Sequence, residues 1–163
     1  MSSTVFTGPV LAGNVLQSDG TGNLAGVGGS TGTQNVGFVD MVQAQAITQA
    51  TNGSSAGVFT TTIVIPANSF ITSIDVFVTA AWSGAAATLG IGTTASATAL
   101  TTAGAVDGSA LGRVIVAPGT GATQIGNWVN VGNTDIQVIV TSTNTGSGVG
   151  YLSVRYAQGI NLS

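Results

Sequence analysis

The stretch FTTTIVIPANSFITSIDVFVTA, residues 59–80, decides the fold class of this chain. In its first half, every second position is apolar or β-branched until Pro66 ends the run: Phe59, Thr61, Ile63 and Ile65. In its second half, one predicted face carries Phe70, Thr72, Ile74, Val76, Val78 and Ala80. The opposite face carries Ser73, Asp75, Phe77 and Thr79. A period of two in β-branched residues predicts two strands, each with one buried face, joined by a short turn.

The same alternation returns further along the chain, at residues 113–116, 136–141 and 151–156. Further short strands are expected over 39–48, 88–92 and 127–132. Helix competes only over residues 41–50 (MVQAQAITQA), where Ala, Gln and Met favour it, but the surrounding strands favour strand here too. The chain is therefore predicted to be all-β, an antiparallel, jelly-roll-like β-sandwich of about eight strands.

The first 35 residues differ from the rest. Pro9 and eight glycines between Gly8 and Gly32 oppose a helix, and no apolar period is sustained. We predict an extended, Gly-rich amino-terminal arm over residues 1–35, followed by a β-sandwich domain over 36–163. Small apolar clusters along the arm suggest that it becomes ordered against a partner, and they are the candidate docking residues: Val5, Phe6, Val10, Leu11, Val15 and Leu16.

Charge is almost absent from this chain. It has no Lys, His, Glu or Cys, and its five Asp and two Arg give a net charge of −3. These absences remove most side chains that perform acid–base, covalent or thiolate-metal chemistry, so we expect no enzyme, no cofactor and no metal. With two basic residues there is no electrostatic footprint for nucleic acid or for anionic lipid.

Short motifs do not change that expectation. Residues 28–32 and 53–57 match the G-x-S-x-G pattern of a serine nucleophile, but the chain has no His or Lys to accept the serine proton. Residues 19–23 resemble a calcium loop but contribute one carboxylate, and a turn explains them without metal. We therefore predict no catalytic residue.

Unguarded strand edges predict that the chain associates with other chains. Edge strands are normally protected by charge, often Lys, or by Pro, and both are scarce here. Trp82 and Trp128 are candidate oligomer-interface residues; buried core positions and a sugar-binding platform are the alternatives. Asp75 and Arg155 are also interface candidates, either as an ion pair between subunits or as solvated side chains.

Three stretches resemble small head-associated structural proteins of tailed bacteriophages, of the capsid decoration or cement type. They are residues 60–100 (TTTIVIPANSF…TASATAL), residues 126–158 (GNWVNVGNTDI…VRYAQ) and the opening residues 4–26 (TVFTGPVLAGN…GNLAG). The resemblance implies a β-sandwich that binds the outer surface of the phage head, often as a homotrimer, and reinforces capsomer contacts. Its partner would be the major capsid protein, and its location the virion, after synthesis in the host cytoplasm.

Two other classes of function remain open. A head-fibre, tail or collar component would also suit the Gly-rich alternation of residues 8–33. A carbohydrate-binding module would use Trp82 or Trp128. An enzyme is the least expected class.

Overall fold

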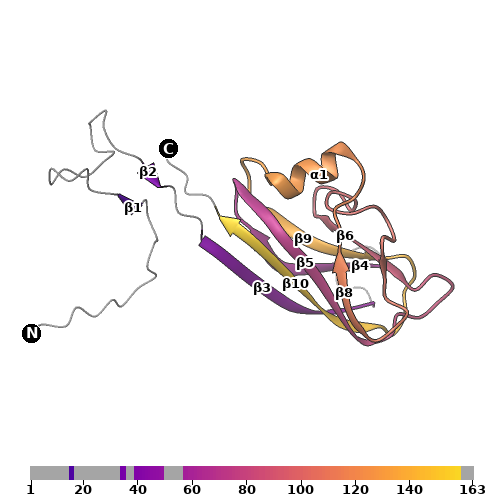
Figure 1. Ribbon diagram of the computed structural model, residues 1–163. Coiled ribbons are helices and arrows are strands. Elements are labelled where there is room, and N and C mark those ends of the chain that lie inside the picture. The colour runs from indigo at the N-terminus through magenta and orange to yellow at the C-terminus, as the bar shows by residue number, and fades with distance from the viewer. Residues whose placement is uncertain (1–14, 17–33, 36–38, 50–56, 159–163) are drawn as a thin grey trace, which may run out of the picture. The chain divides into compact units, whose positions relative to one another are not determined.

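The computed structural model describes residues 15–16, 34–35, 39–49 and 57–158 (Figure 1). The chain divides into two units, residues 40–158 and the remainder at both termini. In the terminal unit, β1 (Val15–Leu16) pairs antiparallel with β2 (Gln34–Asn35). Among the described residues, no helix is long and apolar enough to cross a lipid bilayer.

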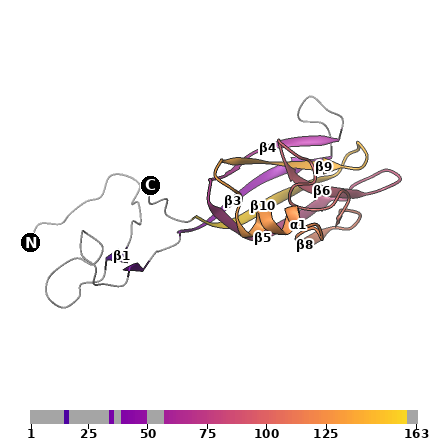
Figure 2. The same cartoon turned by 90° about the horizontal axis from the view of Figure 1, so that it is seen from above.

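The larger unit is a sandwich of two four-stranded antiparallel sheets, which Figure 2 shows as two layers. The first sheet has the order β3-β10-β5-β8, formed by Val39–Thr48, Val149–Gln158, Ser69–Ala80 and Gly112–Val116. The second has the order β4-β9-β6-β7, formed by Val58–Ile65, Ile136–Ser142, Thr88–Thr93 and Val106–Asp107.

The strand order is that of a jelly roll. If β3 to β10 are renumbered 1 to 8 in chain order, the first sheet has the order 1-8-3-6 and the second the order 2-7-4-5. Successive strands then alternate between the two sheets, except that β6 and β7 are neighbours in one sheet. This double Greek key closes both sheets over one core. The predicted fold class is therefore confirmed.

The core lies between the two sheets, where the predicted period of two places it. In β4 every second side chain from Phe59 to Ile65 is buried, and in β10 Leu152, Val154 and Tyr156 are buried. Strands expected over 39–48 and 88–92 appear as β3 and β6. Residues 41–48, where a helix could have competed, therefore form part of a strand, as predicted.

One bulge changes the predicted face of β5. Thr72 was predicted to point inward, yet it is exposed, and Ile71 is buried in its place. The register explains the shift, because Arg155 of β10 lies opposite Ser73 and the next residue, Tyr156, lies opposite Ile71. Thr72 is therefore an extra residue, and a bulge reverses the facing of all residues beyond it.

The strand expected over 127–132 was wrong. Residues Ala122–Val129 form α1, the one helix among the described residues. Its two buried side chains, Gln124 and Trp128, are four residues apart and so share one helical face. The Trp128 Nε1–H donates to the carbonyl of Leu100 at 3.0 Å, which anchors the helix over the core.

Glutamines cover the free edge of β4 from within the chain. The Gln43 amide donates from Nε2 to the Val64 carbonyl at 2.6 Å and accepts at Oε1 from the Val64 N–H at 3.3 Å. Gln45 Oε1 accepts from the Thr62 N–H at 2.6 Å. These side chains of β3 replace a neighbouring strand and join the margins of the two sheets. The sequence argument expected other subunits to cover the edges; for β4 the cover is internal.

We expect Gln43→Leu to lower the free energy of unfolding by about 1 kcal/mol. The backbone N–H and carbonyl of Val64, at an edge that water reaches, lose their partner, and so does the Tyr156 hydroxyl. Gln158→Leu is the matched control, since Gln158 is an exposed glutamine at the end of β10. Urea denaturation measures the difference, and light scattering tests whether the uncovered edge promotes aggregation. Equal stability of the two variants would contradict the assigned role of Gln43.

Candidate functional site

Large apolar side chains gather on the outer face of the sheet β3-β10-β5-β8. Phe77 of β5 lies directly opposite Tyr151 of β10. On the other side of β5, Ile115 of β8 lies opposite Asp75, which is two residues before Phe77. Phe77, Tyr151 and Ile115 are 40%, 50% and 70% exposed. We call these three residues the outer patch. Large exposed apolar side chains on three neighbouring strands of one face are typical of a surface that a partner covers.

Charge on this face is balanced. Both arginines of the chain lie here, and each is close to an aspartate. Arg113 donates from Nε to Asp75 Oδ1 at 2.9 Å, and its Nη2 lies 2.8 Å from the same oxygen. Arg155 Nε lies 3.9 Å from Asp40 Oδ2. The outer face therefore presents apolar surface with paired, mutually neutralising charges.

The interface candidates Asp75 and Arg155 both lie on this face but are not paired with each other. Asp75 is nearly buried and bonds to Arg113 of the neighbouring strand within the same chain, so it is not a solvated side chain. Arg155 is exposed beside Asp40. The sequence could not select Arg113 as the partner, because that choice depends on the register between β5 and β8.

We expect Arg113→Met to destabilise the protein by about 1 kcal/mol, because Asp75 keeps little access to water after losing its partner. Methionine preserves the apolar stem of arginine. Arg155→Met is the control, and it is expected to change the free energy of unfolding by about 0 kcal/mol since both partners there are more than half exposed. Urea denaturation of Arg113→Met, of Asp75→Asn and of the double variant isolates the interaction energy of the pair. Similar losses for Arg113→Met and Arg155→Met would contradict this assignment.

The two tryptophans are core residues of the sandwich. Trp82 is 3% exposed and donates from Nε1 to Ser142 Oγ at 3.0 Å, while Trp128 is 9% exposed. Neither ring presents a face to solvent on which a sugar could stack. They also leave little surface for an oligomer interface, and the outer patch offers Phe77 and Tyr151 in their place.

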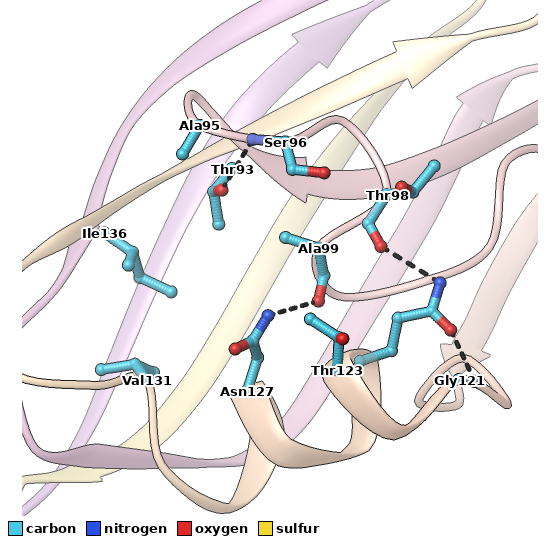
Figure 3. Close-up of a pocket in the computed structure, with 11 residues that line it drawn as sticks. Thr93, Ala95, Ser96, Thr98, Ala99, Gly121, Thr123, Asn127, Val131 and Ile136 are labelled. Atoms are coloured by element: carbon cyan, nitrogen blue, oxygen red, sulfur yellow. Dashed lines mark hydrogen bonds between the residues drawn. The ribbon is translucent and has the colours of Figure 1, made fainter.

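A pocket of about 550 Å³ lies between α1 and the loop over residues 93–99 (Figure 3). Asn127 Nδ2 donates to the Ala99 carbonyl at 2.8 Å, and Gln124 Nε2 donates to the Thr98 carbonyl at 3.1 Å. These amides hold the loop to the helix. The lining contains neither a charged nor an aromatic side chain, so it offers no strong anchor to a charged ligand or to a sugar ring.

Titratable groups form no metal site in the part of the chain that the structure describes, where no three Asp, Glu, His or Cys side chains come together. Asp107 ends β7 in a turn. Hydrogen bonds from the side chain and the backbone N–H of Ser109 lower the pKa of Asp107. This interaction stabilises a local turn.

The arm residues proposed for docking fall largely outside the described residues. Val5, Phe6, Val10 and Leu11 lie there, while Val15 and Leu16 form β1. Sequence reasoning did not select the outer patch, although a signal existed. The alternation had already placed Phe77 and Tyr151 opposite the core-facing residues of their strands, and large aromatic residues at such positions are unusual.

Comparisons with known proteins assign no family. No family model matches the chain, and no curated protein matches it. A solved structure of the cyanophage Pam1 capsid asymmetric unit is similar with a TM-score of 0.48 and 16% sequence identity, covering 84% of this chain and 97% of that chain. A similarity of this size assigns neither a fold nor a function.

Proposed function

We propose that this protein is a structural component of a virion, a decoration or cement protein that binds the outer surface of a phage head. The observation that carries the proposal is the outer patch: three large apolar side chains, 40–70% exposed, on a face whose charges are paired. Such a face suits permanent association with a large, mostly neutral surface better than transient binding of a charged substrate.

The fold and composition support this choice among the known uses of jelly rolls. That architecture recurs in viral capsid proteins, lectins and cupins. Cupins hold their metal mainly through histidine, which this chain lacks. The tryptophans named for the sugar-binding alternative, Trp82 and Trp128, are both buried and cannot form its platform. Fold alone does not assign function, so the argument depends on the exposed face and on the sequence resemblance.

The mechanism proposed for such a protein is passive. A protein that binds the assembled shell, and not its free subunits, stabilises the shell by mass action. Each bound copy adds buried area across the seams between capsomers. The major capsid protein is the partner, and the resemblance implies that the bound unit is a homotrimer.

The first test is the copy number in virions. Quantitative mass spectrometry of gradient-purified particles from the source phage should give about one-third to one copy per major capsid protein if each capsomer position is decorated. A few tens of copies would favour the head-fibre, tail or collar alternative. Absence from the particle would overturn the virion proposal.

The second test concerns the outer patch itself. We expect Phe77→Ser combined with Tyr151→Ser to weaken binding to undecorated heads at least tenfold, since two half-exposed aromatic anchors are lost. Ile125→Ser combined with Val129→Ser is the matched control, because these α1 residues are 49% and 70% exposed but lie outside the sheet. Co-sedimentation with heads measures both pairs. Equal binding by the two double variants would exclude the outer patch as the shell contact.

The arm is tested separately. Deletion of residues 2–35 is expected to abolish capsid binding while the sandwich remains folded, as measured by co-sedimentation and by circular dichroism. Full binding by the truncated protein would remove the arm from the docking surface. The outer patch would then be the remaining candidate.

A further inference from the structure

Strand β8 ends its sheet with an uncovered edge. It pairs with β5 on one side and is the last strand in the order β3-β10-β5-β8, at the margin of its layer in Figures 1 and 2. Among the described residues, no backbone hydrogen bond joins Gly112–Val116 to anything beyond that ladder. Of the other end strands, β4 is covered by Gln43 and Gln45, β7 is only two residues long, and β3 carries the glutamines that cover β4. An open edge of five residues is a template for another strand.

The side chains of β8 are compatible with pairing to a further strand at its open edge. Val114 packs on the core yet remains only partly buried, because the sheet stops beside it. Ile115, on the outer face, is 70% exposed. No Lys, Pro or Glu within β8 protects this edge, and its one charge, Arg113, is neutralised by Asp75 in the same chain. The edge is thus apolar and electrically balanced.

From these observations we propose that β8 pairs antiparallel with β8 of a second copy of this chain, about a two-fold axis at Val114, to join two sheets into one. The register follows from the facing of the side chains. In an antiparallel pair, opposite residues lie on the same face, so the axis must pass through a residue and not between two.

Only one such axis suits the whole strand. Centred on Val114, the pairing uses all five residues, with Arg113 opposite the second copy's Ile115 and Gly112 opposite its Val116. Centred on Arg113, it would place two guanidinium groups opposite each other, which is destabilising. Because Arg113 and Arg155 are each paired with an aspartate of the same chain, this face brings no net charge to the contact. The contact also brings two outer patches onto one continuous sheet.

This inference does not depend on the proposed function, because it concerns the protein in solution. A strand edge pairs once, so the contact gives particles with an even number of chains. These are dimers, or hexamers if trimers also form. We expect size-exclusion chromatography with light scattering to find an even number. Weak complexes have dissociation constants in the micromolar range, so the protein is measured up to about 100 μM. Monomers or trimers at every concentration would overturn the proposal.

A charge substitution tests the position of the contact. Ile115→Lys places a second cation opposite Arg113 and should halve the number of chains in the particle. Val129→Lys, at a residue that is equally exposed but lies in α1, should leave it unchanged. Circular dichroism confirms that both variants fold. A particle that is unaffected by Ile115→Lys overturns the proposal.

The register is tested with a cysteine, since the chain has none of its own. Val114→Cys brings two thiols to the axis, where opposite Cα atoms lie about 4.5–5.5 Å apart, within the range that a disulfide spans. Oxidation should convert this variant into covalent dimers. Val58→Cys, a half-buried valine of β4, should stay monomeric in a denaturing gel. No dimer from Val114→Cys, or equal dimer from both variants, overturns the proposed register.

Discussion

Replacing Gln49 by leucine is expected to lower the free energy of unfolding by about 3 kcal/mol or more, since several buried backbone groups lose their partners together. Gln49 is fully buried. Its Nε2 donates to the carbonyls of Ser83 and Asn144 at 2.6 and 3.0 Å. Its Oε1 accepts from the N–H groups of Ser83 and Gly148 at 2.8 and 3.1 Å. One amide thus satisfies four backbone groups in two loops.

Leucine preserves the approximate size of the side chain, so the measured loss reports hydrogen bonding more than packing. Gln43→Leu provides the comparison, because that amide bonds to the backbone of Val64 at an edge reached by water and, besides, only to the hydroxyl of Tyr156 among the described residues. Urea denaturation followed by circular dichroism should give the larger loss for Gln49→Leu. Equal losses would mean that water replaces the Gln49 amide as readily as the Gln43 amide.

Trp82→Ala is expected to destabilise the protein by about 3–5 kcal/mol, the range for removing a large aromatic side chain from a core. The ring is closely enclosed by glycines. A Cβ added at Gly148 would lie 2.6 Å from the ring atom Cδ2 of Trp82, and one added at Gly108 would lie 3.1 Å from it. The two loops therefore approach the indole because they lack side chains there, and they cannot fill the cavity that alanine leaves.

Trp82→Phe separates the packing of the ring from its hydrogen bond to Ser142 Oγ. It is expected to lose less stability than Trp82→Ala because most of the buried area remains. Trp128 stays in both variants, so its fluorescence follows unfolding in each. If Trp82→Ala and Trp82→Phe had equal free energies of unfolding, the packing of the ring against Gly108 and Gly148 would not contribute to stability.

The alternation of residues predicted most of the sandwich because it is a local property. In a strand, successive side chains point to opposite faces, so the buried series from Phe59 to Ile65 needs no knowledge of the neighbouring strand. The same holds for Leu152, Val154 and Tyr156 of β10. The scarcity of charge is a property of composition alone and does not depend on the arrangement of the strands.

The helix was missed because its signal is short. Only Gln124 and Trp128 define the buried face of α1, and a glycine lies between them at position 126. Two positions cannot distinguish a helical period from a strand period. The helix is held in place by a contact that is distant in the sequence: Trp128 donates a hydrogen bond to the carbonyl of Leu100, 28 residues away.

The sequence by itself determined the fold class, the inward faces of β4 and β10 and the near-absence of ionisable groups. Only the tertiary structure decided that Thr72 is a bulge, that Asp75 pairs with Arg113, and that Gln43 and Gln49 replace missing backbone partners. It also decided that β8 lies at the edge of its sheet. The physical reason is range: side-chain alternation is fixed by the geometry of one extended strand, whereas register and edge position depend on which distant strands pair.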